Sequence, residues 1–450
     1  MKPSMLVRRD THGPARTVPN FFLPLCSPLS RRRTKPSGTP PAHRERRDAA
    51  CTCDCDRQRK SCGVDSKNSR QNPGSRRVCS YGTISAVKKI LAVAALVLAP
   101  IVASMQSSDL LPGMPPPLDP HDVYAANRPG KMNPTAASYP DRVYVPNSGS
   151  DTVDVIDPKT FKVIDHFAVG HEPQHVVPSW DLKSLWVAAD LGNKLTHIDP
   201  ATGKKLETIP IDDPYNMYFT PDGKYAIVVA ERLKRLDFRD AQTMKLVQSV
   251  PVQCAGVDHM DFSVDGKFLI ASCEFAGDLI KVDVESRKVL GKLHLKDGGM
   301  PQDVRISPDG SVFYSADMMS NGVWVIDGNA FKNIGFIATG KGAHGLYFSR
   351  DSKYMYVSNR GEGSITLIDT ATRKITTKWK IPGSASPDMG GVSADGKVLW
   401  LSGRYNAEIY ALDTTDGHLL ARIPVGKGPH GLCVFPQPGR YSLGHTGNMR

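Results

Sequence analysis

The chain has 450 residues, of which 40% are hydrophobic, and its 57 Lys and Arg against 45 Asp and Glu give a net charge of +12. Residues 1–86 hold 18 of the basic and 6 of the acidic residues, so residues 87–450 hold 39 of each and carry no net charge. The net positive charge therefore lies in residues 1–86 and gives no reason to infer that the rest of the chain binds nucleic acid. We expect no nucleic-acid partner.

Residues 1–86 are rich in Arg, Pro, Ser and Cys and show no periodic apolar pattern. The closely spaced Cys51, Cys53 and Cys55 match no zinc pattern with a paired second half. Two interpretations of this segment stay open. It is either a disordered cytoplasmic tail on a single-pass anchor, or it is not translated and the true start lies near Val87.

The segment 87–104 has the pattern of a secretory signal peptide. Lys88 and Lys89 precede a run of 13 residues from Ile90 to Val102, all apolar or proline, and the small residues Ala103 and Ser104 follow. The run is too short to span a bilayer comfortably. We therefore expect an exported protein, periplasmic or secreted, with no stable transmembrane segment after processing. Residues 105–140 are Pro-rich and predict a linker or a surface-packed arm.

A repeat of 41 to 44 residues begins near residue 141. Its marker is an aspartate that ends a β-run and opens a turn, at Asp157, Asp199, Asp240, Asp283, Asp327, Asp369 and Asp413. A second turn, most often Asp-Gly-Lys as at Asp222–Lys224, keeps the same spacing. Alternating apolar runs of strand length lie between the markers, so each unit is expected to hold four strands.

Seven such units predict an all-β fold, a seven-bladed β-propeller of four-stranded blades over residues 141–436, with residues 437–450 as a C-terminal tail. The first unit lacks an innermost strand, and the chain ends just after one near Leu432–Phe435. We expect this C-terminal strand to complete the first blade and close the ring, which removes a free sheet edge. We expect a monomer.

The segments Val143–Ser148 (VYVPNS) and Met355–Arg360 (MYVSNR) resemble the YVTN-type repeat of exported bacterial propellers such as the YncE-like proteins. The resemblance covers residues 141–436. It implies the propeller fold, and for function it implies only that members are often binding or accessory proteins. The fold is also similar to the haem d1-binding propeller of dissimilatory nitrite reductases.

Polar residues are expected to surround the mouth of the channel. When the seven repeats are aligned, the residues that begin the innermost strands share one position, and we expect them to form one ring around the channel. They are His175, Asn216, His259, Asp303, His344, Asp388 and His430. The hairpins between the second and third strands add Arg360, Arg404 and Tyr405 at the same face. Such histidines ligate a transition metal or a tetrapyrrole iron, or transfer protons, and the arginines hold a carboxylate or phosphate. The alternative is that the repeated histidines meet a repeated packing requirement.

Cys254 and Cys273 fall near the same mouth, in a loop and at the end of a second strand of one blade. Three interpretations stay open: a disulfide, a soft-metal site with His259, or buried thiols. The candidate metal ligands are therefore His259, His344, His430, Cys254 and Cys273. Cys433 is expected in the core.

The first hypothesis for function is an exported binding or accessory protein whose mouth holds a small ligand, a metal or a protein partner. The alternative is a redox enzyme or a carrier of a metal or tetrapyrrole that uses the histidine ring. The sequence identifies no catalytic residue. We expect His259, His344 and His430 on one face, directed toward the channel entrance and close to Arg404.

Overall fold

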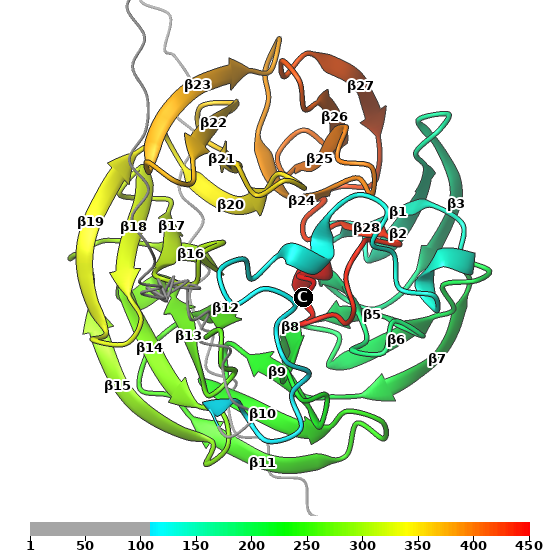
Figure 1. The fold of residues 1–450 in the computed structure, drawn as a ribbon. Coiled ribbons are helices and arrows are strands. Elements are labelled where there is room, and N and C mark those ends of the chain that lie inside the picture. The colour runs from blue at the N-terminus through cyan, green and yellow to red at the C-terminus, as the bar shows by residue number, and fades with distance from the viewer. Residues whose placement is uncertain (1–108) are drawn as a thin grey trace, which may run out of the picture. The chain divides into compact units, whose positions relative to one another are not determined.

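The structure, a computed structural model, describes residues 109–450 and contains seven four-stranded antiparallel sheets around a central channel (Figure 1). The predicted seven-bladed propeller is confirmed. The predicted signal peptide at 87–104, the segment 1–86 and its cysteines lie outside the described residues. No helix within residues 109–450 has the length and apolar character needed to cross a membrane.

Each blade runs from an innermost strand at the channel to an outermost strand at the rim. The innermost strands are β4 (Pro173–Pro178), β8 (Pro214–Phe219), β12 (Val257–Phe262), β16 (Pro301–Ile306), β20 (Ala343–Phe348), β24 (Pro387–Val392) and β28 (Cys433–Phe435). The second strands are β5 (Leu185–Ala189), β9 (Tyr225–Ala230), β13 (Phe268–Cys273), β17 (Phe313–Asp317), β21 (Tyr354–Asn359), β25 (Val398–Gly403) and β1 (Arg142–Asn147). The third strands are β6 (Lys194–Ile198), β10 (Arg235–Asp240), β14 (Asp278–Asp283), β18 (Gly322–Asp327), β22 (Ser364–Asp369), β26 (Glu408–Asp413) and β2 (Thr152–Asp157). The outermost strands are β7 (Lys205–Pro210), β11 (Leu246–Pro251), β15 (Lys288–His294), β19 (Lys332–Ala338), β23 (Lys374–Lys380), β27 (Leu419–Pro424) and β3 (Lys162–Ala168). Blade 1 is the blade of β1, and blades 2 to 7 follow in chain order.

The repeated aspartates form the turns that the sequence predicts. Asp157 and Asp199 each accept a hydrogen bond from the threonine hydroxyl three residues later, at 2.8 Å and 2.7 Å. In the second turn type, Asp265 accepts a hydrogen bond of 2.5 Å from the Ser263 hydroxyl. These local bonds replace backbone partners that the strands lose where they end.

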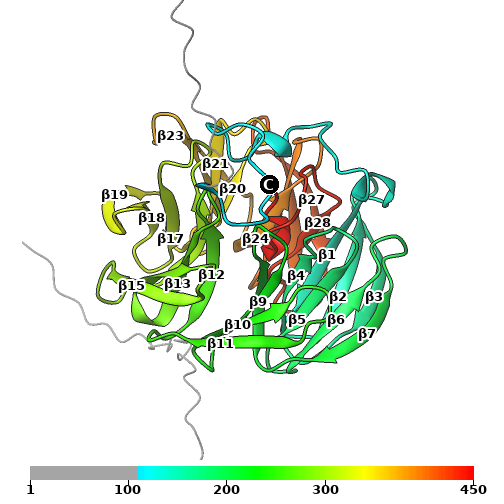
Figure 2. The same cartoon turned by 60° about the horizontal axis from the view of Figure 1, so that its bottom comes forward.

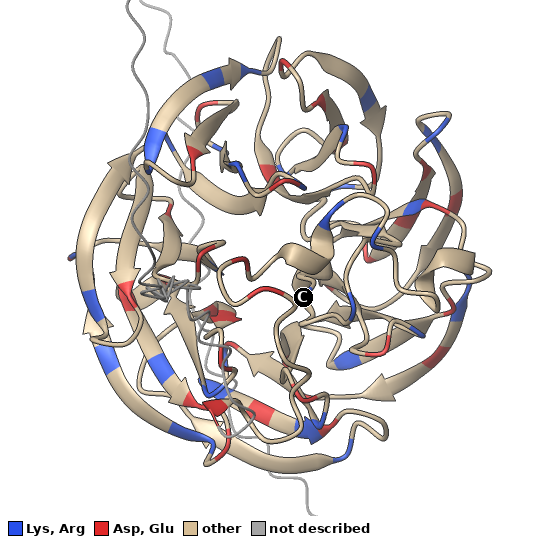
Figure 3. Ribbon diagram, viewed as in Figure 1, with Lys and Arg blue, Asp and Glu red and all other residues tan. Residues whose placement is uncertain are grey.

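The blades bury their inner strands and expose their outer ones. Every residue of β4, β8, β12, β16 and β24 is buried, whereas most residues of β3 and β23 are exposed. Lys and Arg are interspersed with Asp and Glu along the strands and turns in this view (Figure 3). The polar side chains that remain on the innermost strands are therefore in the channel, away from bulk water.

Strand β28 closes the ring as predicted. It pairs antiparallel with β1, with Phe435 opposite Arg142 and Cys433 opposite Tyr144. Cys433 is buried, as expected for a core thiol. The neighbouring Val434 packs in an apolar cluster with Trp400 of blade 7. The C-terminal strand thus joins the first and the last blades.

The N-terminal arm and the C-terminal segment cover one end of the channel. The arm donates hydrogen bonds from Leu111 N to Asp265 O (2.8 Å) and from Val123 N to Pro308 O (2.7 Å). Both acceptors lie in turns between first and second strands, so the arm crosses the face formed by these turns. The arm (cyan) and the C-terminus lie at this same end (Figure 2). The opposite end, formed by the hairpins between second and third strands, is the mouth.

Candidate functional site

The strand register places the channel-lining residues in two layers. The first residue of each innermost segment pairs with the last residue of the second strand, as in Pro173 with Ala189, Pro214 with Ala230, Val257 with Cys273, Pro301 with Asp317, Ala343 with Asn359, Pro387 with Gly403, and Pro429 with Asn147. The next residue forms the layer nearer the mouth, which contains Gln174, Tyr215, Asp258, Gln302, His344, Asp388 and His430. The residue after that forms the deeper layer, which contains His175, Asn216, His259, Asp303, Gly345, Met389 and Gly431. The single ring of the sequence alignment therefore combined residues of two layers.

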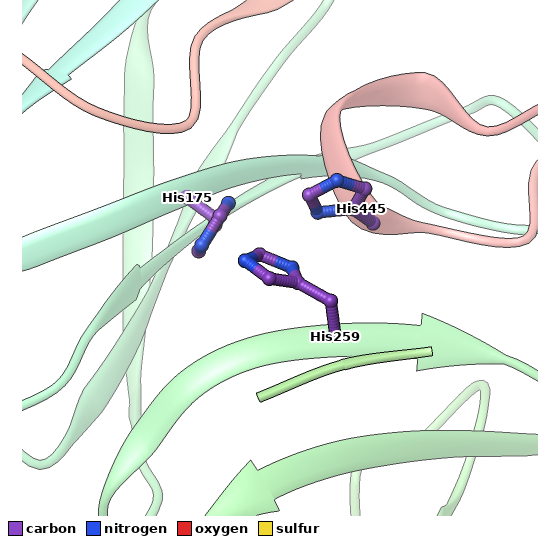
Figure 4. Close-up of side chains that lie close together, drawn as sticks. All are labelled: His175, His259 and His445. Atoms are coloured by element: carbon purple, nitrogen blue, oxygen red, sulfur yellow. The ribbon is translucent and has the colours of Figure 1, made fainter. Parts of the chain in front are cut away.

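Three histidines of the deeper part of the channel lie together. The ring centroids of His175 and His259 are 5.2 Å apart, and those of His259 and His445 are 4.6 Å apart (Figure 4). One nitrogen from each of these three rings lies within 4.8 Å of the other two. All three residues are fully buried. We call this set the histidine triad.

His445 reaches the channel from the C-terminal segment 437–450, which the sequence predicts to be a tail. The segment turns through η5 (His445–Gly447), and both His445 and Thr446 have positive φ values, 34° and 41°. Each such residue costs about 1 to 3 kcal/mol and persists only where its surroundings fix it. Arg450 fixes the end of the segment through a hydrogen bond of 2.6 Å from its guanidinium to Asp261. No repeat position marks His445, because it follows the seventh unit.

Asn216 determines where the triad carries its protons. Its Nδ2 lies 3.2 Å from His259 Nδ1 and 3.0 Å from His445 Nδ1, while its Oδ1 accepts the Met217 N–H at 2.8 Å. The amide therefore donates to both Nδ1 atoms, and each neutral ring carries its proton on Nε2. These Nε2 atoms face carboxylates, His259 to Asp258 at 3.0 Å and His445 to Asp303 at 3.5 Å.

The histidine triad is neutral and contains unpaired nitrogens. Burial lowers the pKa of His259 to about 4 and takes the pKa of His175 and His445 well below the usual range. Neither ring nitrogen of His175 has a hydrogen-bond partner. A buried nitrogen without a partner is costly, so the arrangement suits a group that accepts lone pairs.

The remaining predicted histidines belong to a different cluster in the layer nearer the mouth. His344 Nδ1 lies 3.0 Å from Asp388 Oδ1, and His430 Nε2 lies 3.7 Å from Asp388 Oδ2. Arg360 donates from Nε to Asp388 at 3.0 Å and from its terminal nitrogen to His344 Nε2. Burial alone would raise the pKa of Asp388, but Arg360 with His344 and His430 holds it well below its usual range. Because the guanidinium already neutralises Asp388, this cluster is less favourable than the triad for a metal ion.

Cys254 and Cys273 form a disulfide. Of the three interpretations that the sequence leaves open, the disulfide is therefore confirmed. The soft-metal site with His259 is wrong, because neither sulfur offers a thiolate, and so is the interpretation as free thiols. The bond connects the loop before β12 to the last residue of β13 and so supports the strand that carries His259.

Of the other predicted residues, Asp303 lies in the deeper layer, and Arg404 and Tyr405 follow the second strand of blade 7 at the mouth. Asp303 contacts Arg305 at 3.5 Å and accepts the Leu346 N–H at 2.9 Å. Arg404 donates to Ser148 Oγ at 2.7 Å and to Gly428 O at 3.0 Å, next to the strand segment of His430. Tyr405 is 71% exposed, with the Arg360 guanidinium 5.8 Å from its ring centroid.

Comparison with known proteins agrees with this architecture. A family model described as "YNCE-like beta-propeller" matches residues 123–440. The curated proteins named "Uncharacterized protein YncE" of Salmonella typhi and Salmonella typhimurium are each 26% identical over 172 residues, which is 35% of this chain and 48% of the relative. The matched part thus spans about half the length of these relatives.

Solved structures share the fold at low identity. Hydrazine synthase of Kuenenia stuttgartiensis is 18% identical with a TM-score of 0.55, over 63% of this chain and 94% of that one. "Dihydro-heme d1 dehydrogenase NirN in complex with DHE" is 18% identical with a TM-score of 0.52, over 73% and 81% of the two chains. A functionally unknown protein from Desulfotomaculum acetoxidans is 13% identical with a TM-score of 0.56, over 65% and 98%. These likenesses show the fold alone.

Proposed function

The chain belongs to the YncE-like β-propeller family, and from this premise we propose that it is an exported metal-binding protein whose channel holds one transition-metal ion on His175, His259 and His445. The observation that carries the proposal is the convergence of three buried imidazoles whose nitrogens lie within 4.8 Å of one another. They come from blade 2, blade 4 and the C-terminal segment, so only the folded ring brings them together.

The donor set favours particular metals. Neutral imidazole suits copper, zinc, nickel and iron, and among divalent ions the affinity of nitrogen sites peaks at copper. The carboxyl groups of Asp258 and Asp303 lie 3.0 Å and 3.5 Å from the Nε2 atoms of His259 and His445. Neither contact has the geometry of a hydrogen bond, so the Asn216 amide is the group that orients these two rings. The Nδ1 atoms of His259 and His445 then carry the lone pairs that a metal ion would accept in place of the Asn216 amide.

Asn216 supports the same proposal, because its NH₂ group lies between the two Nδ1 atoms and donates to both. This is the position from which an ion would accept the same lone pairs. Binding of the ion therefore requires the Asn216 amide to move.

A tetrapyrrole does not fit the triad. The imidazole ring centroids of His175, His259 and His445 are 4.6 to 5.2 Å apart, so these side chains already contact one another and leave no space for a macrocycle between them. We therefore favour ion binding over the tetrapyrrole form of the cofactor-carrier hypothesis.

A metal titration of the chelator-treated protein tests the proposal. We expect isothermal titration with Cu²⁺, Zn²⁺ and Ni²⁺ to give one tight site per chain, and single His259→Ala and His445→Ala variants to lose it. The matched control is His418→Ala, since His418 forms an exposed cluster with Asp413 and Asp416 on the blade surface. Binding that persists in the triad variants, or disappears in His418→Ala, would contradict the proposal.

A further inference from the structure

A cavity lies at the covered end of the channel, between the propeller and the two segments that cross this end. Its walls are the ends of β16, β20 and β24 that point away from the mouth, the arm at Tyr124 and Asn127, and the C-terminal segment from Thr446 to Met449. The cavity encloses about 490 Å³ of empty space, its open entrance included, which suits a small molecule. We call it the closed-end cavity.

Two arginines line the closed-end cavity, and no acidic residue does. Arg305 belongs to β16 and is 6% exposed, and Arg350 follows β20 and is 9% exposed. Arg305 Nε lies 3.5 Å from Asp303, whose carboxylate is not part of the lining. The cavity therefore brings two buried guanidinium groups to one space and offers them no carboxylate there.

Both guanidinium groups have N–H donors without an acceptor. In the described part of the chain the Arg305 guanidinium donates no hydrogen bond, and its Nε is buried without a partner. Arg350 donates from Nε to Ser393 O at 3.0 Å and from Nη2 to Val392 O and Gln437 Oε1, which leaves Nη1 without an acceptor. Buried donors without acceptors are costly, so the cavity suits a ligand that accepts hydrogen bonds from both arginines.

The charge of Arg350 is the one that lacks a counter-charge. At the same end of the channel, Arg450 donates to the carboxylate of Asp261 at 2.6 Å, whereas every acceptor of Arg350 is a neutral carbonyl or amide oxygen. Burial lowers the pKa of Arg350 to about 10, which reflects the same cost of a charge held away from water. An anion of single charge in the cavity would offset this cost.

Part of the cavity wall is apolar. Leu346, Phe348, Val392 and Met449 belong to the lining. The ring of Phe348 packs against that of Tyr124 from the arm, with centroids 4.9 Å apart. A wall of this kind favours an anion with a hydrocarbon part over a compact, strongly hydrated anion such as sulfate or phosphate.

We propose that the closed-end cavity binds a small carboxylate of single charge, with its two oxygens on Arg305 and Arg350 and its short alkyl chain against the apolar wall. Planar guanidinium groups match the two oxygens of a carboxylate. A doubly charged anion would exceed the one charge that lacks a partner. The site shares no residue with the histidine triad and requires no metal ion.

Calorimetric titration of the chelator-treated protein at constant ionic strength tests the site. The probes are acetate, propionate and butyrate, compared with sulfate, phosphate and the uncharged analogue butyramide. We expect one carboxylate to bind with one site per chain and at least about tenfold more tightly than sulfate, phosphate or butyramide. The same carboxylate is expected to raise the melting temperature, because it binds the folded chain.

Variants of the two arginines test the assignment of the site. Arg350→Gln removes the charge without a partner, and Arg305→Lys keeps a charge beside Asp303 but removes the planar donors. Each variant is expected to weaken the best carboxylate about tenfold or more. Arg350→Lys, which preserves the charge, is the second test should Arg350→Gln fail to fold. The control is Arg373→Gln, which removes the same charge from the turn between β22 and β23, outside the cavity lining.

Three results would overturn the proposal. The first is that no carboxylate gives saturable binding. The second is that sulfate or phosphate binds as tightly as the best carboxylate, which would identify a site for inorganic anions. The third is that the variants of Arg305 and Arg350 bind the carboxylate as tightly as Arg373→Gln does. Loss of the triad metal in His259→Ala leaves this test unaffected, so the two proposals fail separately.

Discussion

Asn216 is the residue whose substitution distinguishes a metal site from a structural hydrogen-bond network. Its NH₂ group donates to His259 Nδ1 and His445 Nδ1 at 3.2 Å and 3.0 Å. Replacing Asn216 with Ala removes the competing donor, so we expect the affinity for Cu²⁺ or Zn²⁺ to rise about tenfold in competition with a chromophoric chelator. A fall in affinity would show that Asn216 assists binding instead of competing with it.

Gly431 controls the position of His175 from the neighbouring strand. A Cβ atom at residue 431 would lie 2.0 Å from His175 Nδ1, so Gly431→Ala must displace the imidazole. We expect the metal affinity to fall by about a hundredfold or more, comparable to the largest losses from outer-shell changes, while the far-UV circular dichroism stays the same. The control is Gly391→Ala, where the nearest atom to the new Cβ is 3.5 Å away. Equal affinities of the two variants would contradict the assignment of His175 as a ligand.

The sequence predicts some of these residues and not others, for physical reasons. The excess of histidines at the innermost strands is visible in the repeat, because each blade presents its strand start to the same channel. The repeat does not show the division into two layers, because a shift of one residue in the alignment moves a side chain to another depth in the channel. His445 has no counterpart in any blade, and it reaches the channel only through the positive φ values of the last turn.

At the scale of the element, the disulfide between Cys254 and Cys273 stabilises the hairpin of β12 and β13. The cysteines are 19 residues apart, and closing a loop of this size contributes about 3 kcal/mol to the free energy of unfolding. We expect Cys254→Ala/Cys273→Ala to lower the stability by about this amount in urea denaturation. An unchanged midpoint would mean that β12 is held by its packing alone.

Strand β28 is the element on which ring closure depends. Deleting residues 430–450 removes the pairing of β28 with β1. It also removes Leu432 and Val434 from the apolar cluster of Trp400, where burial of each of these two side chains contributes about 2 kcal/mol to stability. The deletion also leaves Asp261 without Arg450 and Asn448. We expect the truncated chain to lose its cooperative thermal transition. A truncated chain that melts at the same temperature as the full chain would contradict this account of closure.

At the scale of the whole molecule, the repeat predicts seven blades and their closure, because every blade has the same two turn types and the same strand lengths. The arm and the C-terminal segment lie outside the repeat, and their packing follows from single contacts such as Val123 N with Pro308 O. These two segments cover the end of the channel opposite the mouth.

The central claim is that one metal ion binds on His175, His259 and His445. Anomalous scattering at the absorption edge of copper or zinc, from crystals of the loaded protein, tests it most directly. The account predicts one strong anomalous peak per chain, surrounded by these three imidazoles with the Asn216 amide displaced. A peak at His344, Asp388 and His430, a peak at Asp413, Asp416 and His418, or no peak at all would contradict it.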